Sequence, residues 1–256
     1  MKTEAIWQAL IDRLDQMQEA GQSADFWLRD DDAIEPTAAL HRLLEVTERF
    51  SVPLTLAVIP AHTDERLERC LAGHRDISIA VHGWSHENHA PQGEKRQELG
   101  SHRPGGTVCE ELRAGYARLK ALFPASFVPL LVPPWNRIGV EVVAGLGAIG
   151  FRALSVFGPE RSGKAAALLR PGLEIINTHV DVIDWRGSRG CRDHAEIVRD
   201  ILTRLEQAAE GGGSVGILTH HLVHDENVWA FLSKLFEITA THPASRWRKV
   251  SDLIGR

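Results

Sequence analysis

The sequence predicts an α/β protein whose parallel strands form a closed or nearly closed barrel, and three observations support this fold class. Short, mostly apolar runs of strand length recur along the chain, at residues 26–29, 54–59, 77–81, 127–132, 151–157, 173–178 and 214–219. Segments with apolar residues at helical spacing follow them, at roughly 37–50, 63–73, 107–122, 139–147, 192–210 and 226–240. Runs such as LTLAVI and SVGILT are apolar at nearly every position, which is typical of strands buried on both faces.

The order of these elements predicts how they connect. Regular alternation of strands and helices indicates right-handed βαβ units and a parallel sheet. Seven strands connected in this way fit a barrel better than an open sheet. Because no internal repeat or linker interrupts the pattern, we predict a single domain over residues 1–256, with an N-terminal helix in 1–22 and the barrel in 23–256. That helix is amphipathic, so it caps the barrel or packs on a partner chain, and the oligomeric state stays open.

Composition and charge exclude several classes of protein. The formal net charge is −5, whereas nucleic-acid-binding proteins usually carry a basic surface. No run of 18 apolar residues is present, which argues against a membrane span. The N-terminus carries acids and lacks the apolar stretch of a signal peptide, and three widely spaced cysteines are typical of free thiols in a reducing compartment. We therefore expect a cytoplasmic protein.

Polar clusters follow the predicted strands, and 13 histidines are present in the chain. In barrels of this kind, the loops at the C-terminal ends of the strands carry the chemistry. The clusters lie at those ends, at residues 30–32, 82–89, 133–137, 181–185 and 220–224. We therefore expect them to converge at one rim.

Two of the clusters together predict a metal site. Asp30, Asp31 and Asp32 place three carboxylates side by side, which cannot all ionise cheaply without a cation. His82 and His86 are four residues apart, so both imidazoles can face one point. Two imidazoles and one carboxylate leave positions open for water and substrate and suit zinc or another first-row divalent ion. A solvated acidic loop and a chance pair of surface histidines are the simpler alternatives.

Three further segments carry chemistry of a less specific kind. The Pro-Pro-Trp-Asn run at 133–136 offers an aromatic wall, or it is only a structural turn. The segment 181–185 places two acids beside an indole, or it is a capping loop. His220, His221 and His224 leave the last strand, where one of them can serve as a general acid and the others lie on the rim. We expect His62 to be incidental.

In this order, the motifs resemble those of the polysaccharide deacetylases of carbohydrate esterase family 4, from about residue 26 to 225. The resemblance implies a distorted seven-stranded (β/α) barrel. It also implies that Asp31 is the catalytic base and that Asp32, His82 and His86 hold the metal. Because Asp30 makes a triple, a shift of one residue would instead make Asp30 the base and Asp31 the ligand.

The remaining motifs of the family match less completely. Val132 stands where the family has an arginine that steadies the base, and Arg29 or Arg137 could replace it. By resemblance, Asp184 orients the acid histidine and Trp185 lines the acetyl pocket. The acid histidine itself is His220, with His221 as the alternative. Trp135 and Asn136 are assigned to substrate binding by the same comparison of motifs.

The activity that the resemblance implies is metal-dependent deacetylation of a carbohydrate. The metal would be Zn²⁺, with Co²⁺, Ni²⁺ and Fe²⁺ as alternatives. The substrate would be an N-acetylated or O-acetylated sugar or glycan precursor, for example for a surface polysaccharide of the O-antigen type. Two other functions stay open: a non-catalytic sugar- or metal-binding barrel, which Val132 favours, and a metallohydrolase that acts on another small amide.

Overall fold

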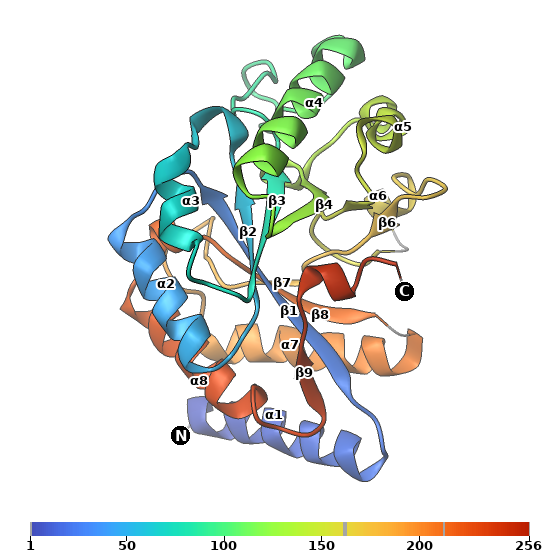
Figure 1. Ribbon diagram of the computed structural model, residues 1–256. Coiled ribbons are helices and arrows are strands. Elements are labelled where there is room, and N and C mark those ends of the chain that lie inside the picture. The colour runs from blue at the N-terminus through green and yellow to red at the C-terminus, as the bar shows by residue number, and fades with distance from the viewer. Residues whose placement is uncertain (1, 161–162, 212, 256) are drawn as a thin grey trace. The chain divides into compact units, whose positions relative to one another are not determined.

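The computed structural model describes residues 2–160, 163–211 and 213–255, so the predicted domain's end residues 1 and 256 lie outside the described part. The predicted α/β class is confirmed, because helices alternate with strands along most of the chain (Figure 1). The chain divides into two compact units, each built from segments distant in sequence. The first comprises Met1–Asp30, Thr37–Leu54 and Thr178–Lys249, and the second comprises Asp31–Pro36, Thr55–Asn177 and Val250–Arg256. The single domain over 1–256 stays a prediction.

In the first unit, the strands pair directly or through a neighbour with β1 (Ala24–Ala33). The residues of β1 up to Asp30 belong to this unit. Strand β8 (Ser214–Thr219) pairs with β1 in parallel, and β7 (Val180–Asp181) pairs with β8. The short strand β9 (Ser245–Trp247) pairs with the start of β1. The register sets Asp30 opposite Thr219, so the acid that ends this part of β1 meets the polar end of β8.

Helices of the first unit bury one apolar side each. They are α1 (Lys2–Glu19), α2 (Ala38–Arg49), α7 (His194–Gly211) and α8 (Glu226–Thr239). The helix expected in residues 1–22 is thus present as α1, which packs along α7 (Figure 1). Its buried residues recur every three or four positions, which is the spacing of one helical face. They are Trp7, Leu10, Leu14 and Met17.

In the second unit, the strand order is β6-β5-β4-β3-β2-β1, where β1 contributes its last residues, 31–33. The strands are β2 (Leu54–Val58), β3 (Ile77–His82), β4 (Phe127–Val132), β5 (Ala153–Leu154) and β6 (Glu174–Ile175). The pairs β3–β4, β4–β5 and β5–β6 are parallel, as predicted. Every residue of β2 and β3 is buried, which explains their almost uninterrupted apolar sequences.

Two predicted strands of the second unit are much shorter than expected. The runs at 151–157 and 173–178 each form only two residues of strand, β5 and β6. Asn177 accounts for the difference, because its buried side chain accepts the N–H of Val156 and donates to the carbonyl of Gly158. A side chain thus satisfies the backbone where the strand ladder would otherwise continue.

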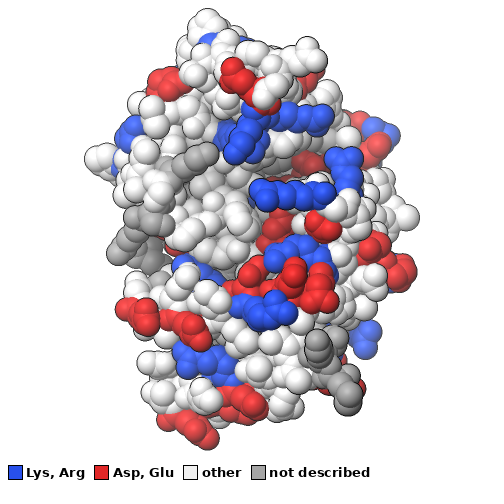
Figure 2. Space-filling view, turned by 180° about the vertical axis from the view of Figure 1, so that it is seen from behind, with Lys and Arg blue, Asp and Glu red and all other residues white. Residues whose placement is uncertain are grey.

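The helices of the second unit connect its strands. They are α3 (Glu65–Leu71), α4 (Gly105–Leu122), α5 (Val140–Ile149) and the single turn α6 (Gly163–Ala166). A long irregular segment, 83–104, separates β3 from α4. None of the helices in the described residues is both long and apolar enough to cross a membrane. On the face shown in Figure 2, Lys and Arg side chains lie among Asp and Glu side chains.

Candidate metal centre

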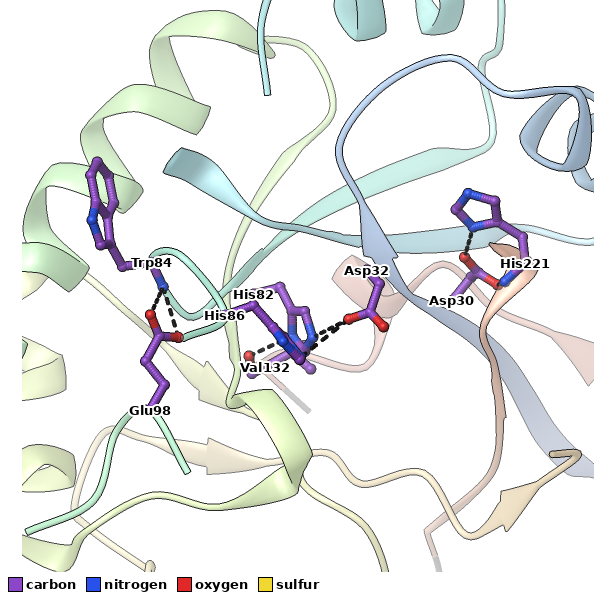
Figure 3. A network of polar contacts seen from close by, with 8 residues as sticks. All are labelled: Asp30, Asp32, His82, Trp84, His86, Glu98, Val132 and His221. Carbon is purple, nitrogen blue, oxygen red and sulfur yellow. Dashed lines mark hydrogen bonds and ion pairs between the residues drawn. The ribbon is translucent and has the colours of Figure 1, made fainter. Parts of the chain in front are cut away.

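The second unit brings together Asp32, His82 and His86. One ligand atom from each lies within 4.8 Å of the others. His82 Nε2 is 3.0 Å from Asp32 Oδ1, and His86 Nε2 is 3.3 Å from the same oxygen (Figure 3). The strand ends explain this convergence, because Asp32 lies near the end of β1, His82 ends β3, and His86 follows four residues later.

The chemistry of these three residues fits a divalent metal ion. His82 Nδ1 lies 2.9 Å from the Val132 carbonyl oxygen, which can only accept, so Nδ1 carries the proton and Nε2 is left as the ligand atom. Two imidazole nitrogens and one carboxylate oxygen then face a common point. This set matches the ligands of catalytic zinc sites, in which further positions stay open. Val132 therefore orients a candidate ligand through its backbone.

The backbone of the candidate ligands is strained. Asp32 has φ 72° and His86 has φ 59°, both in the left-handed region of backbone conformation that residues other than glycine rarely adopt. Such conformations cost on the order of 1–3 kcal/mol each and cluster at functional sites. Two of the three candidate ligands thus adopt a costly conformation, which indicates that surrounding contacts hold them.

Charges in the centre act on the two imidazoles in opposite directions. Burial disfavours the charged form of His82, but Asp31 and Asp32 outweigh it and raise the pKa of His82. Burial and the nearby His82 lower the pKa of His86. Asp31 is itself buried, with 2% of its surface exposed, and it acts electrostatically on His82. A second carboxylate therefore lies close to the three candidate ligands.

The Pro-Pro-Trp-Asn segment contributes an aromatic side chain to this centre. The Trp135 ring lies 4.3 Å from the His86 ring, centroid to centroid. Trp135 and Asn136 have φ of 54° and 55°, and the Asn136 N–H donates to the Pro133 carbonyl. The tight turn thus places the predicted aromatic wall beside a candidate ligand, whereas the role of Asn136 in substrate binding stays a prediction.

The first unit holds the predicted acid histidine. The Trp185 ring lies edge-on to the His220 ring, at 4.7 Å between centroids. The Asp184 carboxylate accepts the N–H groups of the next residues in its own turn, Arg186, Gly187 and Ser188. Those bonds lower the pKa of Asp184. The structure thus brings Trp185 to His220, while the role of Asp184 toward His220 stays a prediction.

His221, the alternative acid, forms a buried pair with Asp30. Its Nδ1 is 2.5 Å from Asp30 Oδ1 (Figure 3). Its backbone N–H donates to Asp30 Oδ2 (2.8 Å), which also accepts the Thr219 hydroxyl. Burial opposes ionisation of Asp30, but His221 outweighs it and lowers the pKa of Asp30. Asp30 thus contacts Thr219, at the end of β8, and His221, whereas Asp32 lies with the two candidate histidines. Which two of the three acids are base and ligand stays a prediction.

The two arginines proposed to replace the missing one are placed differently. Arg29 is fully buried in β1, two residues before Asp31, so the two side chains leave the same face of the strand. Arg137 donates its Nη1 to the Arg96 carbonyl, and that bond is exposed. Which of the two replaces the missing arginine stays a prediction.

The structure also identifies residues that the motifs miss. Glu98, 1% exposed, accepts hydrogen bonds from the loop between the two candidate histidines. It lies in the polar stretch between β3 and α4, where no spacing or motif in the sequence indicates a role. His62, expected to be incidental, donates from Nε2 to the Ser85 carbonyl in the same loop (3.2 Å). Among the described residues, the group that could hold a metal comprises Asp32, His82 and His86 and does not include His89.

Comparison with known proteins gives a clear result for the fold. No sequence profile of a known protein family matches the chain, and no curated protein sequence does so at a significant level. Several solved structures, in contrast, match the chain. A Mycobacterium smegmatis protein assigned to the polysaccharide deacetylases is 17% identical, with a TM-score of 0.67 over 91% of this chain and 90% of its own.

Two further structures extend this likeness. A family 4 carbohydrate esterase from Streptomyces lividans, solved with acetate, is 14% identical, with a TM-score of 0.59 over 91% of this chain and 96% of its own. The chitin deacetylase of Colletotrichum lindemuthianum is 16% identical, with a TM-score of 0.57 over 91% and 88%. The chain therefore has the fold of polysaccharide deacetylases, and the predicted distorted (β/α) barrel is confirmed.

Proposed function

We propose that this chain is a divergent polysaccharide deacetylase that removes acetyl groups from an N-acetylated or O-acetylated sugar or glycan precursor in a metal-dependent reaction. The observation that carries the proposal is the grouping of Asp32, His82 and His86, with Asp31 beside them, at strand ends. The structures with the same fold are carbohydrate deacetylases and esterases by name. Ligand chemistry and fold thus support the same activity.

The metal would be held by Asp32, His82 and His86. Zn²⁺ suits this set best, and Co²⁺, Ni²⁺ and Fe²⁺ are the alternatives. When bound, such an ion lowers the pKa of water and polarises an acyl oxygen. Metal dependence of the activity is part of the proposal.

In the proposed reaction, two side chains divide the proton transfers. Asp31 accepts the proton of the attacking water at its carboxylate, and His220 donates a proton to the leaving nitrogen or oxygen. Trp185 packs edge-on against His220 and limits the orientations of its ring. An amine leaves poorly without a proton, so His220 matters more for N-acetyl than for O-acetyl substrates. Trp185 is assigned to the acetyl pocket, and Trp135, whose ring lies beside His86, is assigned to substrate binding.

The cellular role belongs to the same proposal. We expect the substrate to be a soluble or lipid-linked precursor of a surface polysaccharide, such as an O-antigen-type glycan, processed in the cytoplasm. The three cysteines are free thiols, which suits a reducing compartment.

Acetate release tests the activity. The purified chain is assayed on acetylated amino sugars with Zn²⁺ added and then chelated, alongside Asp32→Ala and Asp31→Asn. We expect acetate release that the chelator abolishes, loss of bound zinc in Asp32→Ala, and in Asp31→Asn retained zinc with about 10²–10⁴-fold slower release. An Asp32→Ala variant that kept both zinc and hydrolysis would refute the assignment.

The same assay separates the two rival functions. A non-catalytic barrel, which Val132 favours, would bind zinc or sugar but release no acetate from any substrate. A metallohydrolase of another kind would cleave members of a panel of non-sugar amides and leave the acetylated sugars intact.

A further inference from the structure

The loop between the two candidate histidines is held by one buried carboxylate. Ser85 donates to Glu98 Oε1 from its N–H (2.7 Å) and from its hydroxyl (3.1 Å), and the Trp84 N–H points at the same carboxylate (3.2 Å to Oε2; Figure 3). Glu98 is 1% exposed. A carboxylate out of water is costly unless such donors compensate it. A buried carboxylate thus serves to bind the backbone of one short turn.

The backbone of this turn packs closely against the Glu98 side chain. Gly83 has φ +60°, and a Cβ built on it would lie 2.0 Å from Glu98 Oε2 and 2.7 Å from Pro134 Cγ. Only glycine can therefore adopt this conformation so close to the carboxylate. The Glu98 side chain packs directly on the residue that follows His82.

The opposite edge of the loop is also tied down. The Trp84 carbonyl accepts the Ala61 N–H (2.9 Å), and the Ser85 carbonyl accepts from His62 Nε2 (3.2 Å). Glu98 takes the N–H groups of the same two residues. The peptides between the candidate ligands are thus held by two sets of bonds, one from Ala61 and His62 in the turn after β2 and the other from Glu98.

The two histidines depend on this loop to different degrees. His82 ends β3 and is oriented by the Val132 carbonyl. His86 lies beyond the loop, outside any strand or helix, and has φ 59°. The position of its imidazole therefore follows from the conformation of residues 83–85.

From this geometry we infer that Glu98 is a positioning residue for the metal centre. It holds residues 83–85 so that His86 presents Nε2 to the same point as His82 and Asp32, and it thereby sets the affinity for the metal. The inference rests on the proposed metal site and adds a residue that does not contact the ion. Partners of this kind typically change metal affinity about 10–100-fold when they are removed.

The affinity for Zn²⁺ alone tests the inference. Competition with a chromophoric chelator, well below the unfolding midpoint, gives the Kd of the wild-type chain and of Glu98→Ala, Glu98→Asp and Glu98→Gln. All three donors reach Oε1, which glutamine keeps, so we expect Glu98→Gln to bind within about threefold of wild type. Glu98→Ala lacks the acceptor and Glu98→Asp withdraws it by one methylene, so both should bind about 10–100-fold more weakly.

A matched control lies in the same unit. Glu174, in β6, accepts the N–H of Gly255 (2.7 Å) and so is another carboxylate that holds backbone. Glu174→Ala should leave the zinc Kd unchanged. The unfolding midpoints of the metal-free variants are measured in parallel, because a purely structural role would lower the midpoint of Glu98→Ala and leave its Kd unchanged.

The outcomes separate this inference from the proposed function. If the wild-type chain binds no zinc, the proposed function fails. If the wild type binds zinc and Asp32→Ala does not, but Glu98→Ala and Glu98→Asp match the wild type, only the role of Glu98 is overturned. A loss in Glu98→Gln as large as in Glu98→Ala would overturn it too. Should Glu98→Ala not fold, the contrast between Glu98→Asp and Glu98→Gln still decides.

Discussion

Three consecutive acids, Asp30, Asp31 and Asp32, meet three different surroundings at the end of β1. Asp30 is fully buried against His221 and Thr219, and Asp31 is buried near His82. The Asp32 side chain is 30% exposed and faces two imidazoles. Side chains alternate along a strand and the left-handed backbone at Asp32 breaks that alternation, so neighbours in sequence take up separate roles.

The Asp30 carboxylate is predicted to serve stability and not metal binding. Asp30→Ala should lower the free energy of unfolding by about 3–5 kcal/mol, because it leaves His221 buried without its partner. Urea denaturation measures the loss, and metal analysis of the folded fraction should still find zinc. Loss of catalysis with unchanged stability would instead support the shifted assignment, with Asp30 as the base and Asp31 as the ligand.

His224 should make the chain sensitive to acid. Burial is the main cause that lowers the pKa of this imidazole to about 4, and its ring packs edge-on to Trp229. Between the unfolded pKa near 6.5 and the folded value near 4, the unfolded chain binds the proton first. Stability contributed by neutral His224 is thus complete above pH 6.5 and lost as pH falls toward 4, by up to about 3 kcal/mol.

Replacement of that imidazole tests the sign. In urea unfolding at pH 7, 5.5 and 4.5, the free energy of unfolding of His224→Phe should fall less steeply with acid than that of the wild type. His41, an exposed histidine on α2, is the control, and His41→Gln should follow the wild type. Parallel curves for His224→Phe and the wild type would contradict the prediction.

At the scale of elements, the start of α8 shows how one side chain joins a helix to a loop. Asp225 Oδ1 accepts the Val228 N–H (2.9 Å) as the helix cap, and Oδ2 accepts the Cys191 N–H (3.1 Å). The carboxylate also lies at the positive end of the helix dipole. One residue therefore satisfies donors from two segments that are distant in sequence.

Removal of this cap has a predictable cost. Asp225→Ala should lower the free energy of unfolding by about 1–2 kcal/mol, since an N-cap donor and a loop donor lose their acceptor. Asp225→Asn keeps a capping oxygen and should recover most of that loss. Thermal and urea unfolding of the two variants measure the difference; equal losses would show that the charge, and not the cap, is responsible.

At the scale of the whole molecule, the metal should couple the site to the stability of the chain. An ion that binds only the folded state stabilises it by RT ln(1 + [L]/Kd), about 2.7 kcal/mol at 100 times the Kd. For a chain of this size, that corresponds to a rise in unfolding midpoint of roughly 5–10 °C.

Calorimetry with and without Zn²⁺ checks this coupling, and Asp32→Ala should show no rise. Mg²⁺, which prefers oxygen ligands, serves as the control ion and should have little effect on the wild-type chain. A midpoint that responds equally to both ions, or that still rises in Asp32→Ala, would place the stabilising ion elsewhere.

The sequence alone was sufficient for the α/β class, most of the elements and the candidate ligands, but it missed α6, β7 and β9. Apolar runs indicate burial of whole strands, and the ends of parallel strands lie at one edge, so the sequence alone indicates Asp32, His82 and His86. The HxxxH spacing and the order of the motifs likewise indicated the fold that the solved structures share.

Only the tertiary structure decided how the acids and histidines are partnered. Asp30 with His221, the carbonyl of Val132 on His82, and Glu98 on the loop at 83–85 are contacts between residues from 13 to 191 positions apart. No local periodicity records such contacts, because they depend on strand register and on irregular backbone. For the same reason β5 and β6 are short: the buried Asn177 side chain takes the place of the strand ladder.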